Sequence, residues 1–204
     1  MTIPYNEGIY FITFTCSKWL PLIEMTNGYR HVYKWYDYLK IQGHFVLGYV
    51  IMPNHVHSII AFRSQDSSNS SSYVTFRYGK SINNIISNGK RFMAYAIVAD
   101  LKALEQFNLL SSLANGVNTT QQAMGKKHEV FEPSFDWKEC GGLHILCQKL
   151  DYIHQNPCKG NSPLANSQQD YRHSSASYYL TGVHSEYEVT DYMNMKDIDL
   201  TKGG

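Results

Sequence analysis

The chain has 204 residues, which is enough for one ordinary domain with a sizeable core. Lysine and arginine total 18 and aspartate and glutamate total 17, so the formal net charge of +1 gives no global attraction to nucleic acid. No apolar run approaches the roughly 20 residues that span a bilayer, and residues 1–7 lack the pattern of a secretory signal. The four cysteines form no C-x-x-C pair or disulfide framework, so we expect a reduced, cytoplasmic protein with no membrane partner.

The first part of the chain alternates between strand-like and helix-like patterns. Residues 10–15 are aromatic and β-branched, which predicts a buried strand. Residues 29–41 carry aromatic and apolar side chains at helical intervals. Two strand-like runs follow at 45–52 and 55–62, and the Pro-Asn pair between them is typical of a tight connection between antiparallel strands.

The middle of the chain is more polar. Residues 64–72 are nearly all Ser, Asn, Asp and Gln, which predicts a flexible surface insert. Residues 81–107 have helical spacing, and we expect two helices broken near Asn88-Gly89. Residues 111–124 are interpreted as a second loose stretch.

The pattern of the last third completes the expected fold. A clear helix covers residues 143–156 and stops at Pro157. We expect a short ordered segment at 171–180 and a flexible tail at 185–204. Strand, helix, two strands, helix and a further element indicate an α+β protein, for which a ferredoxin-like antiparallel sheet with packed helices is the natural candidate. Residues 1–204 are expected to form a single domain, without internal repeats.

His55 and His57 are the first candidate site residues. Residues i and i+2 of a strand point to the same face, so both imidazoles would project together while Val56 packs on the other face. Neutral imidazole is a common metal ligand, although an isolated His-x-His is more often incidental. Here the pair opens an apolar strand after a turn, which favours a metal site. Two histidines do not complete such a site, so a third ligand is expected elsewhere.

The second candidate group lies on the helix predicted at 143–156. Tyr152 and Asn156 are four residues apart and share a helix face. A phenol with an ordinary pKa of about 10 is a weak nucleophile and needs a metal or a base. The Asn156 carbonyl oxygen would complete a His-His-Asn cation site beside it. Taken singly, a half-buried tyrosine and a helix-ending asparagine are the plainer alternatives, and His154, which faces away, is interpreted as structural.

Taken together, residues 52–57 and 150–157 resemble the paired motifs of the single-tyrosine HUH transposases. The resemblance is closer to their REP-associated tyrosine transposase branch. His55-Val56-His57 corresponds to the family's two histidines around a hydrophobic residue. The catalytic tyrosine of the family maps onto Tyr152, which places a catalytic tyrosine helix after the sheet. The amide that completes the family's metal site maps onto Asn156.

The resemblance extends over roughly residues 5–180 and implies a chemistry. Its members use Mg²⁺ or Mn²⁺ to cut single-stranded or hairpin DNA, and they transfer the strand through a 5′-phosphotyrosine link. The metal identity comes from the resemblance alone, because two imidazoles suit softer ions than Mg²⁺. The sequence departs from the family at residues 158–162, which are polar where an apolar, Gly-containing stretch is usual, and in the insert at 64–72.

DNA contacts and rival functions complete the hypotheses. Lys90, Arg91, Lys126 and Lys127 are candidate phosphate contacts, although a solvated charged face explains each of them equally well. The active protein is expected to be a monomer or a homodimer. Two other functions stay open: a phosphodiesterase that uses a metal-activated water, and a non-catalytic or domesticated binder of structured nucleic acid.

Overall fold

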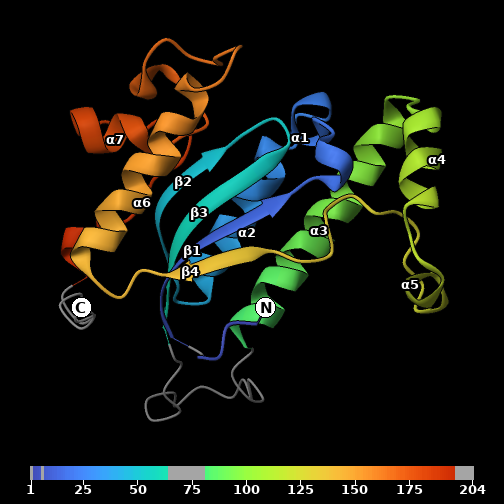
Figure 1. The fold of residues 1–204 in the computed structure, drawn as a ribbon, viewed down its shortest axis with the longest axis horizontal. Coiled ribbons are helices and arrows are strands. Elements are labelled where there is room, and N and C mark those ends of the chain that lie inside the picture. Colours follow the sequence, from blue (N-terminus) through green and yellow to red (C-terminus); the bar gives the residue numbers. More distant parts are fainter. Residues whose placement is uncertain (1, 6, 64–80, 196–204) are drawn as a thin grey trace.

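The computed structural model describes residues 2–5, 7–63 and 81–195 of the chain (Figure 1). Its centre is a four-stranded antiparallel sheet with the order β2-β3-β1-β4. The strands are β1 (Gly8–Thr15), β2 (Phe45–Ile51), β3 (His55–Phe62) and β4 (Asp136–Glu139). The expected insert at 64–72 lies outside the described residues.

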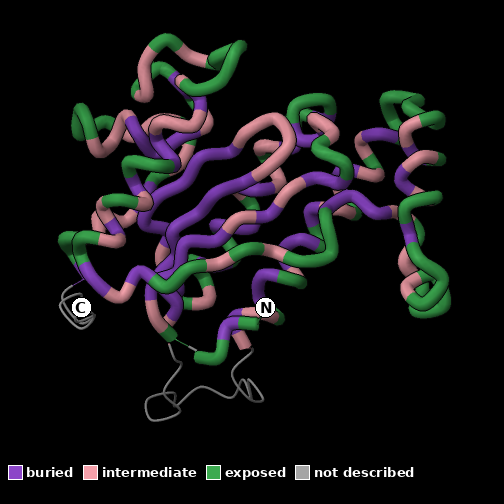
Figure 2. Tube along the Cα trace, viewed as in Figure 1, coloured by how far each residue is buried: buried purple, intermediate pink, exposed green. Residues whose placement is uncertain are grey.

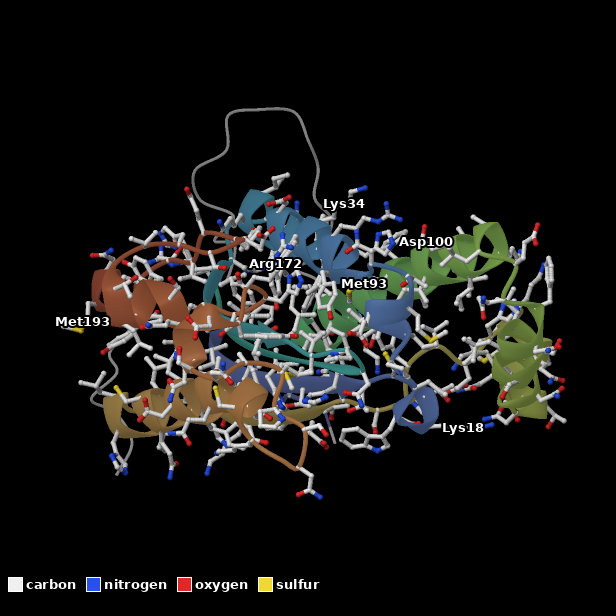
Figure 3. The ribbon with its side chains drawn as sticks, turned by 90° about the horizontal axis from the view of Figure 1, so that it is seen from above. Lys18, Lys34, Met93, Asp100, Arg172 and Met193 are labelled. Atoms are coloured by element: carbon white, nitrogen blue, oxygen red, sulfur yellow. The ribbon has the colours of Figure 1, made fainter. Side chains whose placement is uncertain are left out.

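Helices cover both faces of the sheet. They are α1 (Leu22–Met25), α2 (Tyr29–Ile41), α3 (Ile82–Ala103), α4 (Phe107–Asn115), α5 (Thr119–Ala123), α6 (Leu143–Gln155) and α7 (Ala176–Thr181). Short 3₁₀ turns lie at Ser17–Trp19, Asn156–Cys158, Gln168–Asp170 and Tyr192–Asn194. Helices α2 and α3 pack on one face of the sheet and α6 on the other, which the view from above shows as three layers (Figure 3). No helix among the described residues combines the length and the apolar character that a membrane span requires.

If the shorter helices α1, α4 and α5 are left out, the elements up to β4 run β1-α2-β2-β3-α3-β4, the β-α-β-β-α-β order that is typical of ferredoxin-like domains. The central strands are buried on both faces, as the tube coloured by burial shows (Figure 2). Successive strand residues therefore enter two different cores. The core under α2 and α3 includes Tyr10, Ile12, Phe14, Val56 and Ile60. The core under α6 includes Ile9, Phe11, Val50, Ile59 and Leu150.

Helix α3 runs without a break, so the expected interruption near Asn88-Gly89 is wrong. Gly89 is buried, and a Cβ atom there would overlap Nε1 of Trp35. The glycine therefore serves helix packing, because it lets the indole of α2 lie directly against the backbone of α3. The sequence alone does not distinguish a glycine that allows close helix packing from a glycine that ends a helix.

Replacing Gly89 by alanine is expected to destabilise the protein by about 1–3 kcal/mol, because the buried indole ring has to move. The helix-propensity gain of about 1 kcal/mol offsets part of this cost. Urea unfolding measures the difference, with the exposed Ser87→Ala on the same helix as the matched control. Equal unfolding free energies for the two variants would contradict the packing role.

Two segments that were expected to be loose are ordered. Residues 111–124 contain the end of α4 and all of α5, with Leu113 buried. Residues 185–195 of the expected tail pack against the sheet and α2: the Thr190 amide donates to the Val46 carbonyl at 2.9 Å. The predicted tail is therefore wrong for this part, and residues 196–204 lie outside the described chain.

Candidate active site

The two histidines lie on the face of the sheet that α6 covers. The antiparallel register of β1 and β3 pairs Thr13 with His57 and Thr15 with His55. The ring centroids of His55 and His57 are 4.7 Å apart, and His57 stacks on Phe11 at 5.4 Å. The expected common face of the two imidazoles is thus observed.

Each histidine has a hydrogen-bond partner for its Nδ1 atom. Nδ1 of His55 lies 2.7 Å from Oδ1 of Asn54, and Nδ1 of His57 lies 2.6 Å from Oγ1 of Thr13. An amide oxygen only accepts, so Nδ1 of His55 carries the proton and the Nε2 lone pair is free. The Thr13 hydroxyl can support the same tautomer at His57 by accepting. Such partners orient metal-binding histidines in proteins.

Burial keeps both rings neutral. It lowers the pKa of His55 to about 4. Burial, with the nearby His55 and Lys149, lowers the pKa of His57 to about 3. Metal binding needs the neutral form, and both imidazoles hold it at neutral pH.

Helix α6 brings Tyr152 to this pair. Its buried residues Leu150 and Ile153 dock on the sheet, and Gly48 leaves room for them because a Cβ there would lie 2.5 Å from Cδ2 of Leu150. The Tyr152 ring lies 5.4 Å from the His57 ring and 5.9 Å from Phe11, measured between centroids. The tyrosine is 43% exposed, so its ring contacts the imidazole while the side chain stays open to solvent.

Asn156 makes no hydrogen bond to His55 or His57 in the described part of the chain. It caps the C-terminal end of α6, and its Nδ2 donates to the Tyr152 carbonyl at 3.1 Å. The described residues contain no group of three His, Cys, Asp or Glu side chains that could hold a metal. Within the described residues, a third protein ligand for a metal at the histidine pair would therefore be of another residue type.

Two lysines flank the tyrosine, and neither was predicted as a site residue. Nζ of Lys149 lies 4.5 Å from the Phe11 ring centroid and 5.4 Å from that of Tyr152. Nζ of Lys159 lies 5.7 Å from the Tyr152 centroid. Lys149 could have been found, since it precedes Tyr152 by three residues on the helix. Lys159 follows the helix in irregular chain, where no periodicity predicts its direction.

Lys90 does not have the position that a phosphate contact requires. It is buried, and its ammonium donates to the carbonyl oxygens of Glu132 at 2.7 Å, Pro133 at 3.4 Å and Ser134 at 2.7 Å. Burial lowers its pKa to about 8. The expected phosphate contact is therefore wrong for Lys90, because its donors are used inside the protein.

The other three candidate cations lie away from Tyr152. Lys126 bridges to Glu129 at 2.6 Å, and Lys127 is exposed just beyond α5. Arg91 lies on α3, across the sheet from α6, and α5 is at the opposite end of the molecule from α6 (Figure 1). These residues do not line the same site as Tyr152.

His154 has the structural position predicted for it. It is buried, and its Nε2 lies 2.9 Å from the Ser175 hydroxyl. That serine also accepts from the Tyr49 amide at 3.0 Å, so the pair ties α6 and the start of α7 to β2.

The fold and the site define a mixed α/β protein in which a histidine pair on an antiparallel sheet faces an exposed tyrosine on a covering helix. No protein-family model and no curated protein sequence matches the chain. Its structure is similar to that of a REP-associated tyrosine transposase bound to a REP hairpin, with a TM-score of 0.53 and 16% sequence identity over 94% of this chain and 92% of that one. A protein from Deinococcus radiodurans R1 that has been assigned as a transposase gives a TM-score of 0.32 and 14% identity over 76% of this chain and 95% of that one, a likeness too weak to establish a common fold. The first comparison establishes a common fold with a REP-associated tyrosine transposase.

Proposed function

We propose that this protein is a transposase-like enzyme that cleaves single-stranded or hairpin DNA and transfers the strand through a 5′-phosphotyrosine on Tyr152. The observation that carries the proposal is the contact between the two sequence motifs, with the Tyr152 ring 5.4 Å from His57 and His57 4.7 Å from His55. The fold shared with a transposase that was solved with a DNA hairpin supports the same reading.

The reaction that suits these residues is a transesterification. The Tyr152 phenol oxygen attacks phosphorus and loses its proton, and the P–O3′ bond breaks. The products are a 5′-phosphotyrosyl strand and a 3′-oxygen that takes up a proton. The link conserves the phosphodiester, so the 3′-hydroxyl of another strand can attack it and release Tyr152. The exposure of Tyr152 gives an unpaired backbone access to the phenol.

His55 and His57 fit a divalent ion, with Asn156 as the proposed third ligand and Mg²⁺ or Mn²⁺ as the proposed metal. The fit rests on the two neutral rings on one face and on their engaged Nδ1 atoms, which direct Nε2 to a ligand. A bound ion supplies positive charge to the phosphate oxygens as negative charge develops on them. The Asn156 Nδ2 donates to the Tyr152 carbonyl, and the proposed ligand is the other atom of this amide, Oδ1.

Lys149 and Lys159 are proposed to hold the phosphate that Tyr152 attacks. Their ammonium groups lie 5.4 and 5.7 Å from the Tyr152 ring centroid, so two positive charges are close to the side chain that would attack the phosphate. This arrangement gives the site local positive charge in a chain of net charge +1.

Replacing both lysines by glutamine is expected to weaken hairpin binding. It is also expected to reduce the steepness of the plot of log K against log salt concentration by about 1–2, because each phosphate contact releases condensed counterions. Fluorescence anisotropy across a salt series measures both quantities. The matched control is Lys102→Gln, an exposed cation on α3, across the sheet from Tyr152. A salt slope equal to that of the parent protein would remove the two lysines from the phosphate site.

The test of the proposed function maps the covalent link. The protein is incubated with labelled single-stranded hairpin oligonucleotides and Mn²⁺, the adduct is isolated under denaturing conditions, and the nucleotide-bearing peptide is identified by mass spectrometry. The expected link is on Tyr152, and a chelator prevents it. A fully paired duplex of the same sequence is the matched control and is expected to react poorly. A link on another residue, or one that forms with chelator present, would contradict the proposal.

A further inference from the structure

A cavity lies between α2 and α3, on the face of the molecule opposite Tyr152. Its volume is about 550 Å³, within the range of roughly 300–1,000 Å³ that is typical of ligand sites. The residues that matter most in its lining are His31, Lys34, Trp35, Arg91 and Phe92. None of them belongs to the histidine–tyrosine site.

The apolar part of the lining is aromatic and partly open. Phe92 is 63% exposed, which is unusual for so large an apolar side chain. Trp35 is buried beside it, and its Nε1 has no hydrogen-bond partner among the described residues. Gly89, also in the lining, lets this indole reach the α3 backbone. The cavity thus combines an open aromatic ring with a buried indole that packs against the α3 backbone.

The charged side chains of the lining are all basic. Arg91 places its guanidinium carbon 5.3 Å from the Phe92 ring centroid, and Lys34 lies on the α2 side. The carboxylate of Asp100, which contacts the lining residue His31, is paired, because it accepts from Arg30 at 2.6 Å and lies 2.6 Å from Nε2 of His31. Figure 3 labels Lys34, Met93 and Asp100, which lie together on the side of the molecule away from α6. The cavity therefore favours an anion with a flat apolar part.

We infer that this cavity binds an unpaired nucleotide, with the base against Phe92 and the phosphate on Arg91 and Lys34. An aromatic ring beside cations is the common arrangement for single-stranded nucleic acid. The inference rests on the proposed function and deepens it, since it places a second DNA contact across the sheet from the nucleophile. A strand held there is a different segment from the one that Tyr152 cuts.

The experiment uses the full chain with Tyr152→Phe in chelator, so that binding is measured without cleavage. The ligand is a labelled oligothymidylate of about eight nucleotides, followed by fluorescence anisotropy. Adding Phe92→Ala or Arg91→Gln is expected to lower the affinity roughly five- to a hundredfold, the range for losing one stacked base or one phosphate contact.

Two matched controls keep the result specific. Phe107→Ala removes a phenylalanine on α4 that is 62% exposed, and Lys102→Gln removes an exposed cation near the end of α3. Both are expected to bind the oligothymidylate like the parent. Equal affinity of Phe92→Ala and Phe107→Ala would overturn the inference. A second result would also overturn the inference: the parent does not bind the oligonucleotide, and Phe92→Ala differs from the parent in its sedimentation coefficient. The occupant of the cavity would then be a second copy of the chain.

Failure of this site and failure of the proposed function give different results. If no phosphotyrosine forms but Phe92-dependent binding persists, the cavity binds nucleotides in a protein that does not cut DNA. If the adduct forms on Tyr152 while Phe92→Ala binds normally, the proposed function stands and the cavity inference is wrong.

Discussion

Replacing Tyr152 by phenylalanine is expected to lower the rate of covalent adduct formation by at least about 10³-fold and to leave hairpin affinity within about threefold of the parent. The change removes one oxygen atom. The ring contacts with His57, Phe11 and the two lysines persist, because they involve the aromatic ring. Since the side chain is 43% exposed, we expect the unfolding free energy to change by less than about 0.5 kcal/mol.

The measurement is a denaturing gel of labelled hairpin oligonucleotides with Mn²⁺, run for the parent, for Tyr152→Phe and for Tyr95→Phe. Tyr95 is an exposed tyrosine on α3, across the sheet, and controls for the loss of any surface hydroxyl. Turnover that survives in Tyr152→Phe without an adduct would favour a hydrolase that activates water. Tight binding by the parent with no cleavage under any metal would favour a non-catalytic binder.

Strong local patterns made much of the fold predictable. Helix α2 was expected at residues 29–41 and strand β3 at 55–62, and both have these bounds. In each segment the hydrophobic period agrees with the final burial, so local and tertiary preferences coincide. The alternation of side chains along a strand also predicted that His55 and His57 share one face, because residues two apart point the same way.

The rest depended on tertiary contacts that leave a weak trace in the sequence. Strand β4 has the sequence Asp-Trp-Lys-Glu, in which most residues are exposed, and pairing with β1 holds it in the sheet. The glycine inside α3 reads as a helix break until the Trp35 ring is seen against it. Lys90 reads as a surface cation until the carbonyl oxygens of residues 132–134 are seen around its ammonium.

Removing the hydrogen bond between Thr13 and His57 is expected to weaken metal binding, although no proposed metal ligand is replaced. Thr13→Val keeps the shape of the side chain and deletes the hydroxyl 2.6 Å from Nδ1 of His57. Loss of such a partner typically lowers metal affinity about 10- to 100-fold. Isothermal titration with Mn²⁺ measures the change, and Thr15→Val on the same strand is the matched control. An unchanged affinity would mean that the threonine does not orient the imidazole.

The pH dependence of Mn²⁺ binding tests the histidine pair independently. Protonation of an imidazole expels a metal, and it occurs as the pH falls through the pKa of the ring. Burial lowers the pKa of His55 to about 4 and, together with the nearby His55 and Lys149, that of His57 to about 3. The proton therefore begins to compete only below about pH 5, whereas rings with the ordinary pKa of about 6.5 would begin to lose the metal near neutrality.

Affinity for Mn²⁺ is thus expected to be nearly flat from about pH 8 to pH 6 and to fall in more acidic solution. The double variant His55→Gln, His57→Gln is expected to bind the ion at least about 100-fold more weakly and to form no adduct. His144→Gln, which removes an exposed histidine from the first turn of α6, is the matched control. A tenfold loss of affinity in the parent between about pH 7.5 and 6 would show that the rings titrate like solvent-exposed histidines. In that case the lowered pKa values of the two buried rings would be wrong.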